Sequence, residues 1–183
     1  MLQKKKCKVF AFEPSVFNLE LLARNINLNG ETERIFIIPL PLSDKTQLNT
    51  MRMTSMELGG ALSTFEKNIG WDGNYIEEVF RYQTLGSTIE DVMCNYGLQI
   101  PDYIKIDVDG IEHFILTGGI EVLNKVNEVL IEVNDGFKEQ AEMCEKILLS
   151  AGLKLKEKRH SKEFDYIDSF GNGKVWNQIW VRN

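Results

Sequence analysis

No glycine precedes Gly30 in this chain of 183 residues. Dinucleotide-binding dehydrogenases place a glycine-rich loop directly after their first strand, because the backbone must approach the pyrophosphate closely. An acid, Glu13, does follow the first apolar segment, as it does in those enzymes. The missing glycines nevertheless exclude a dehydrogenase of that kind.

Basic residues, cysteine pairs and long apolar runs are also scarce. The chain has 21 Lys and Arg against 27 Asp and Glu, a formal net charge of -6, which argues against nucleic acid as the main partner. The cysteines Cys7, Cys94 and Cys144 form no C-x-x-C pair, a usage typical of a reducing cytoplasm without a zinc site. No apolar run reaches the ~18–20 residues that span a bilayer, so we expect no membrane partner.

Apolar strand-like segments alternate with amphipathic helical ones along the whole chain. This alternation predicts an α/β fold with a mostly parallel sheet and helices on its faces, in one domain over residues 1–183. Residues 46–80 have weak periodicity and are predicted to be an irregular insertion with a short edge strand at 61–65. The predicted strands are 8–13, 35–38 (fully buried), 103–107 and 127–133, with an antiparallel pair at 153–159 and 175–181 joined through a turn at 171–173.

Helix signals fill the intervals between these strands. Ser15 is placed to cap a first helix that ends at Asn29-Gly30, and Ser87 to cap another through Glu90. A further helix over 111–123 is interrupted by two consecutive glycines, 118 and 119. The last predicted helix covers 137–150 and stops at Gly152.

Carboxylates follow several of the predicted strands. Asp107, Asp109 and Glu112 come after the strand at 103–106, and Glu13 comes after the first strand. In open α/β folds ligands bind at the carboxyl edge of the sheet, so we expect these acids to form the functional site. Acids crowded on one turn raise one another's pKa, which suits a general base.

The ordered set of segments resembles the FkbM family of S-adenosylmethionine-dependent methyltransferases. The resemblance implies a Rossmann-like class I methyltransferase sheet that is mostly parallel with an antiparallel C-terminal strand, and S-adenosylmethionine as cofactor. Because the family's first strand, glycine-rich loop and first helix have no counterpart before Glu13, it also implies a sheet truncated at the N-terminus. The matching segments are 9–14, 25–30, 42–44, 104–112, 116–119 and 129–133.

The resemblance assigns cofactor roles to residues at two strand ends and one loop. Glu13 would accept hydrogen bonds from the ribose diol, and Pro14 would fix the direction in which the chain leaves the strand. Ser43 and Asp44 would lie at the adenine end. Asp107 would lie near the sulfonium, where the family positions the methyl acceptor.

The same resemblance predicts the catalytic and acceptor residues. Asp107, Asp109 and Glu112 are expected to orient or deprotonate an acceptor hydroxyl, since methyl transfer depends mainly on alignment. The family usually has Glu where this chain has Asp109. His113, Glu132 and Asn134 are expected to contact the acceptor, a small molecule or a glycan, and Lys105 is expected to pair with a neighbouring carboxylate.

Other functions remain open from the residues alone. In a metal-dependent glycosyltransferase, Asp107 and Asp109 would hold a divalent cation against a sugar nucleotide; in a dehalogenase-like phosphatase, an aspartate in the same motif would be the nucleophile. The methyltransferase hypothesis implies no metal. A domain without the cofactor loop can also serve as a non-catalytic binding module, with an exposed strand edge that allows a homodimer.

Overall fold

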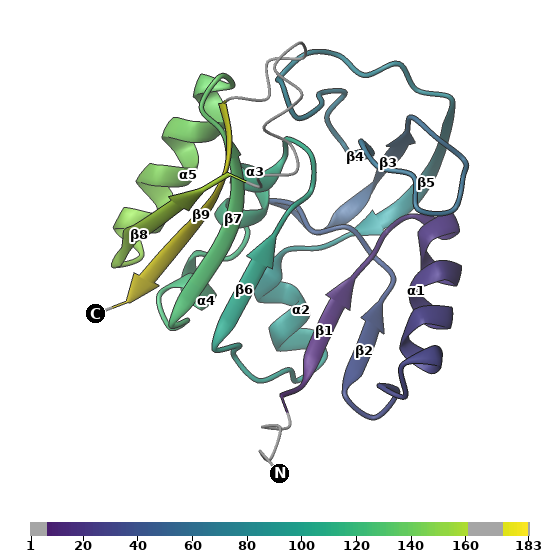
Figure 1. Cartoon of the computed structure of the whole chain (residues 1–183), viewed down its shortest axis with the longest axis horizontal. Helices are drawn as coiled ribbons and strands as arrows, with labels where there is room; N and C mark the ends of the chain where they lie inside the picture. Colours follow the sequence, from purple (N-terminus) through teal and green to yellow (C-terminus); the bar gives the residue numbers. More distant parts are fainter. Residues whose placement is uncertain (1–6, 161–173, 183) are drawn as a thin grey trace.

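The computed structural model describes residues 7–160 and 174–182, in which the strands form three hydrogen-bonded sheets (Figure 1). The first contains β1 (Val9–Phe12) and β2 (Ile35–Ile38), which run parallel and are joined by α1 (Val16–Leu28). Ser15 caps α1 as predicted, because its hydroxyl accepts the Asn18 N–H at 3.2 Å.

The largest sheet contains four strands in the order β6-β7-β9-β8. Its first two strands are parallel, and both pairs that involve β9 are antiparallel. This arrangement confirms the predicted α/β class and the antiparallel C-terminal end, while the predicted turn at 171–173 lies outside the described residues. The strands are β6 (Tyr103–Ile106), β7 (Glu128–Asn134), β8 (Leu153–Arg159) and β9 (Val175–Arg182).

A third, antiparallel sheet has the order β4-β3-β5. Its strands are β3 (Gln47–Met53), β4 (Thr64–Phe65) and β5 (Phe80–Gly86). The prediction of an irregular insertion over 46–80 was therefore wrong for residues 47–53, which form β3. The alternating burial along β5 is the expected pattern for a strand, but long loops separate the three strands and dilute the periodicity. The predicted edge strand is confirmed as the two residues of β4.

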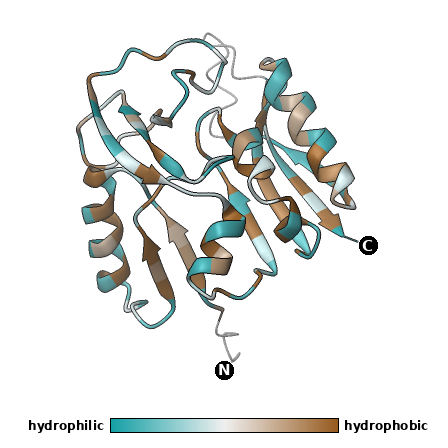
Figure 2. Cartoon of the chain, turned by 180° about the vertical axis from the view of Figure 1, so that it is seen from behind, coloured by the Kyte–Doolittle hydropathy of each residue, from teal (hydrophilic) through white to brown (hydrophobic). Residues whose placement is uncertain are grey.

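Four helices cover one face of the four-stranded sheet and the space next to it (Figure 2). They are α2 (Ile89–Asn95), α3 (Glu112–Thr117), α4 (Ile120–Leu123) and α5 (Lys138–Ser150). Thr88, not Ser87, caps α2 by accepting the Asp91 N–H at 2.9 Å. Ser87 is instead held in an extended bridge with Leu42, which leaves the cap to the next hydroxyl.

The core lies between these helices and β7. Leu116, Leu123, Val129, Ile131 and Leu148 are fully buried there. The predicted break in the helix at Gly118-Gly119 is confirmed, and it has a packing reason: a Cβ on Gly118 would lie 2.2 Å from the Ser43 carbonyl oxygen. None of the described helices is long and apolar enough to cross a membrane.

The strand at 35–38 was predicted to be fully buried, and this is wrong. No residue of β2 is buried, and Phe36 is 42% exposed. β2 is the edge strand of a two-stranded sheet, which leaves few neighbours to cover its side chains. Among the described residues, β1 is hydrogen-bonded to β2 alone and β6 to β7 alone, so the two parallel pairs do not join into one sheet. The fold thus has a break in its sheet between β1 and β6.

Candidate functional site

Glu13 directly follows β1 and lies where the chain turns into α1. Its Oε1 accepts the Ser15 N–H at 2.8 Å, and burial raises the pKa of this half-buried carboxyl. The next carbonyl, of Pro14, accepts the Tyr82 hydroxyl at 2.5 Å from β5. The antiparallel sheet is therefore tied to the corner that holds Glu13.

Ser43 and Asp44 lie on the segment that follows β2. Ser43 is buried; its N–H donates to the Ser87 carbonyl at 2.9 Å and its hydroxyl to Asp44 Oδ1 at 3.2 Å. Asp44 is partly exposed. Of the two, Asp44 is the side chain that a ligand can reach.

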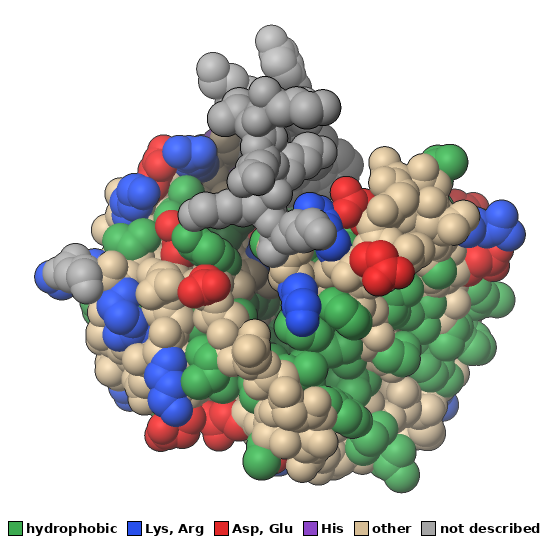
Figure 3. Space-filling view, turned by 90° about the horizontal axis from the view of Figure 1, so that it is seen from below, with side chains coloured by type: hydrophobic (Ala, Val, Ile, Leu, Met, Phe, Trp, Pro, Cys, Tyr) green, Lys and Arg blue, Asp and Glu red, His purple; other side chains and the backbone are tan. Residues whose placement is uncertain are grey.

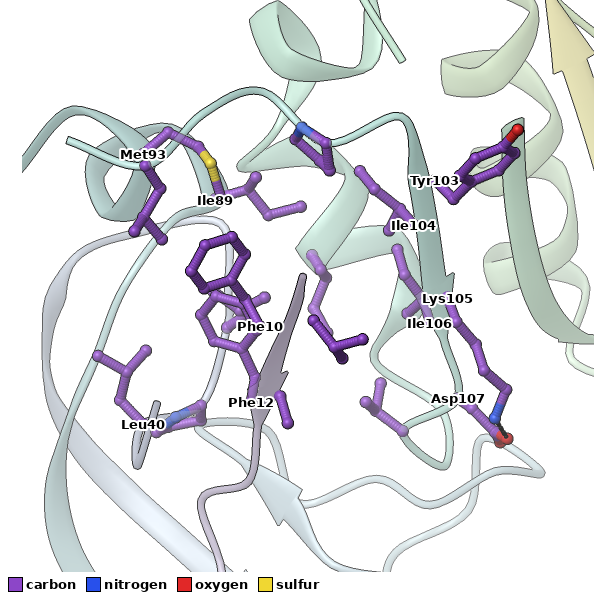
Figure 4. A pocket seen from close by; sticks show the side chains of 18 of the residues that line it. Phe10, Phe12, Leu40, Ile89, Met93, Tyr103, Ile104, Lys105, Ile106 and Asp107 are labelled. Atoms are coloured by element: carbon purple, nitrogen blue, oxygen red, sulfur yellow. Dashed lines mark hydrogen bonds and ion pairs between the residues drawn. The ribbon is translucent and has the colours of Figure 1, made fainter. Parts of the chain in front are cut away.

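Asp107 directly follows β6 and is exposed. Its Oδ2 lies 2.6 Å from Lys105 Nζ, which confirms the ion pair expected for Lys105 (Figure 4). Both side chains line the cavity between β1 and β6. An exposed acid that is paired with a flexible cation remains accessible to a polar ligand.

Asp109 has a left-handed backbone, with φ of 61°, which costs a non-glycine residue free energy. Its Oδ2 accepts the N–H of Leu62 at 2.9 Å, and Leu62 also has a positive φ, 62°. Burial, followed by the charge of Asp107, raises the pKa of Asp109, and the Leu62 hydrogen bond opposes that rise. The strained turn is thus fixed to the loop between β3 and β4.

Glu112 is only 1% exposed and holds the turn between β6 and α3. Its carboxylate accepts the Gly110 N–H at 3.1 and 3.2 Å, the Val108 N–H at 3.3 Å and the Gln140 amide. Burial raises its pKa, while these donors oppose the rise. Such a carboxylate positions the turn that carries Asp107 and Asp109.

Gly110 makes this turn possible. Its φ is +118°, and a Cβ there would lie 2.3 Å from the carbonyl oxygen of Gly70. The loop between β4 and β5 therefore packs directly on the turn that carries the acids.

Glu132 lies on β7, on the strand next to Asp107. It is half-buried, and its pKa rises from 4.5 to about 7, first through burial and then through the charges of Asp107, Glu112 and Asp109. Lys105 opposes the rise. A carboxylate that titrates near neutral pH is suited to accept and release a proton.

His113 and Asn134 are both buried. The His113 ring packs at 4.1 Å from Phe114 and 5.9 Å from Phe137 (centroid distances), burial lowers its pKa, and neither ring nitrogen has a hydrogen-bond partner among the described residues. Asn134 donates to the Trp71 carbonyl at 3.0 Å, and its own N–H donates to Gln140 at 2.8 Å. In this structure both residues contribute to packing around the site.

The structure brings Asp107, Asp109, Glu112 and Glu132 together in one electrostatic cluster. Glu13 follows the end of β1, and Asp44 lies on the segment after β2. Both are therefore on the β1 side of the break between β1 and β6. The described residues contain no group of three side chains suited to hold a metal ion. Asp107 forms an ion pair with Lys105, and Asp109 accepts the Leu62 N–H, so the two aspartates have different partners.

Comparison with known proteins agrees with this architecture. The model of the methyltransferase FkbM domain matches residues 1–167. The chain belongs to the FkbM methyltransferase family. A crystal structure of methyltransferase FkbM from Methylobacillus flagellatus KT is similar to this family member, with a TM-score of 0.59 and 16% sequence identity. The similarity covers 95% of this chain and 36% of that one, so the chain spans about a third of the solved relative's length. A search of curated proteins gave no match.

Sequence reasoning placed Glu132 of this FkbM-family chain only as an acceptor contact and did not predict its raised pKa. Its signal was present, because a carboxylate at 132 shares the carboxyl edge with the acids after 103–106. What the sequence does not reveal is the degree of burial that raises its pKa to about 7.

Proposed function

We propose that the chain carries out S-adenosylmethionine-dependent methyl transfer to a hydroxyl oxygen of a small molecule or glycan. Membership of the FkbM family supports methyl transfer as the reaction. The observation that carries the proposal is Glu132, a half-buried acid with a pKa of about 7 beside the exposed Asp107.

The residues around Glu13 suit the adenosine part of the cofactor. The Ser15 N–H holds Oε1 of Glu13, and a carboxylate has further lone pairs that can accept from the ribose hydroxyls. Asp44, partly exposed beyond β2, would accept from the adenine amino group, and the Ser43 hydroxyl, which donates to Asp44 Oδ1, would hold its carboxylate. Phe12, Pro14 and Leu42 supply apolar walls on this side of the cavity. When bound, the cofactor supplies an electrophilic methyl group.

At the acceptor, Glu132 takes the hydroxyl proton as the oxygen attacks. Burial keeps Glu132 basic enough to accept that proton near neutral pH. Asp107, held by Lys105, orients the hydroxyl, and the anchored backbone of Asp109 fixes the turn against the loop between β3 and β4. The Glu112 carboxylate holds the turn by accepting the Gly110 N–H.

Titration calorimetry with S-adenosylhomocysteine tests this assignment. We expect saturable binding that Glu13→Gln weakens at least tenfold, about 1.4 kcal/mol. Glu20→Gln is the matched control, because Glu20 lies on the exposed side of α1, where it pairs with Arg24 at 2.6 Å. Equal affinity in Glu13→Gln and the parent chain would remove Glu13 from the cofactor site, and no binding up to millimolar ligand would contradict the proposed function.

A further inference from the structure

Glu112 is a buried acid without a cation beside it. Figure 3 shows acidic and basic side chains interspersed on the face seen from below, where solvent screens their charges. Glu112 is 1% exposed, and no salt bridge within residues 7–160 and 174–182 includes it. A buried carboxylate of this kind is costly unless hydrogen-bond donors surround it. The groups around Glu112 therefore decide whether it carries a charge.

The hydrogen-bond partners of the Glu112 carboxyl come from its own turn and from α5. The Val108 N–H donates to Oε1 at 3.3 Å, and the Gly110 N–H donates to Oε1 at 3.2 Å and to Oε2 at 3.1 Å. The Gln140 side-chain amide donates to Oε2. Because backbone N–H groups can only donate, the one partner among these that could accept a proton from Glu112 is Gln140, if its amide oxygen faced Glu112.

A second contact sets the orientation of the Gln140 amide. Gln140 lies in the first turn of α5 and is 2% exposed. The Asn134 N–H, at the end of β7, donates to Oε1 of Gln140 at 2.8 Å. This donor is a backbone group, so the amide oxygen must face Asn134 and the amide nitrogen must face Glu112. A reversed amide would bring two donors together at Asn134.

We propose that Gln140 is a positioning residue of the site: its side-chain amide, locked in one orientation by the Asn134 N–H, holds Glu112 as a carboxylate. A proton on Glu112 would find no acceptor among these partners. The charged form also binds backbone N–H groups more strongly than the neutral acid does. Gln140 thereby stabilises the turn that carries Asp107 and Asp109, although it acts on that turn only through Glu112.

Burial acts against the charged form, because desolvation raises the pKa of Glu112. The backbone N–H groups and the Gln140 amide act in the opposite direction and lower that pKa. A carboxylate that accepts two or three backbone N–H bonds can keep a pKa below about 2. The donors prevail at Glu112, because the neutral acid would leave its own proton without an acceptor and would weaken every bond that holds the turn.

The charge of Glu112 acts on two further groups. It raises the pKa of Glu132 on β7, after burial and the charge of Asp107, and it adds to burial in raising the pKa of the Cys144 thiol on α5. Gln140 thus contributes, through Glu112, to the field at the acid that would accept the proton. This effect on Glu132 rests on the proposed function, whereas the ionised state of Glu112 does not.

Carbon-13 NMR of the Glu112 carboxyl tests the parent chain, with neither cofactor nor acceptor present. We expect a carboxylate at pH 6, at which Glu132, with a pKa of about 7, is still mostly protonated. A Glu112 carboxyl that holds its proton at pH 6 would overturn the proposal. A chain that binds no S-adenosylhomocysteine would contradict the proposed function and leave this inference intact, so the two can fail separately.

Gln140→Leu removes both polar atoms of the amide and keeps a side chain of similar size. We expect the acid dissociation constant of Glu112 to fall at least tenfold, because its charged form loses a donor. Gln178→Leu is the matched control, since Gln178 is another buried glutamine, on β9, whose Oε1 accepts the Trp180 Nε1–H at 3.0 Å. Both variants lose a buried amide and some stability. An equal dissociation constant of Glu112 in the two variants would leave Gln140 with packing alone and contradict the proposal.

Gln140→Glu separates the roles of the two amide atoms. It keeps an oxygen for the Asn134 N–H but places a second carboxyl group against Glu112, and two such groups share one proton. We expect this variant to hold one proton more than the parent chain at pH 6 by carbon-13 NMR. The Asn134 amide should exchange with solvent as slowly as in the parent chain, and at least tenfold faster in Gln140→Leu, which has no acceptor for it. Absence of the extra proton would show that the amide nitrogen of Gln140 does not face Glu112, and the proposal would fall.

Discussion

Glu132 on β7 lies in the electrostatic field of Asp107 at the end of β6, and the charge of Asp107 is, after burial, the next cause that raises the pKa of Glu132 to about 7. Lys105 pairs with Asp107 at 2.6 Å and acts on Glu132 in the opposite direction. Asp107 and Lys105 therefore act in opposite directions on the protonation of Glu132, in addition to burial.

Two neutralising variants should move this pKa in opposite directions. Asp107→Asn removes a negative charge and should lower the pKa of Glu132, whereas Lys105→Met removes a positive charge and should raise it. Carbon-13 NMR of the Glu132 carboxyl measures both shifts. Asp102→Asn, at the exposed amino end of β6, serves as the control. Shifts of the same sign in the first two variants would contradict the electrostatic account.

Ionisation of Glu132 also makes stability depend on pH. Its pKa is higher in the folded chain than in the unfolded one, so the carboxyl contributes fully below about 4.5 and the contribution is lost as pH rises through about 7. Glu132→Gln mimics the neutral acid. It should therefore be more stable than the parent chain at pH 8 by about 1–2 kcal/mol, a value reduced for partial solvation, and nearly equal to it at pH 4. Urea unfolding at both pH values measures the difference; a larger gain at pH 4 would reverse the sign.

The positions of the strands that carry the acids follow from sequence. Apolar runs before Glu13 and Asp107 are short and β-branched or aromatic, so their ends were predicted to within a residue or two. The antiparallel sheet over 46–86 was not predicted, because β4 is only two residues long and its pairing with β3 is non-local. Local periodicity does not encode such pairing.

The chemical environment of the site residues was harder to predict from the sequence than their positions in the fold. Glu112 and Asp107 are both acids near one turn. Glu112 is buried and accepts hydrogen bonds from three groups, whereas Asp107 is exposed and pairs with Lys105. His113 follows Glu112 and was expected to contact the acceptor. In the structure its ring packs against the rings of Phe114 and Phe137. Which face of a short helix is buried depends on neighbours distant in sequence.

Removal of the Glu112 carboxylate should destabilise the chain strongly. Glu112→Ala leaves the N–H groups of Val108 and Gly110 and the Gln140 amide without their acceptor in a buried site. We expect a loss of about 3 kcal/mol in the free energy of unfolding. Glu145→Ala, on the exposed side of α5, should change it by less than about 0.5 kcal/mol. Urea unfolding of the two variants makes the comparison, and similar losses would argue that Glu112 does not support the turn.

Gly110→Ala should cost more than Gly30→Ala, although both glycines have a positive φ. Gly30 has φ of +66° and open space around its missing Cβ, whereas at Gly110, with φ of +118°, the Cβ would lie 2.3 Å from the Gly70 carbonyl oxygen. We expect about 1 kcal/mol of destabilisation at Gly30, from backbone conformation alone. Steric overlap with a backbone atom should bring the total at Gly110 to about 3 kcal/mol. Urea unfolding gives both values, and hydrogen exchange of the Trp71 amide reports whether the loop has moved off the turn. Equal costs at the two positions would mean that the loop between β4 and β5 does not press on the turn that carries Asp107 and Asp109.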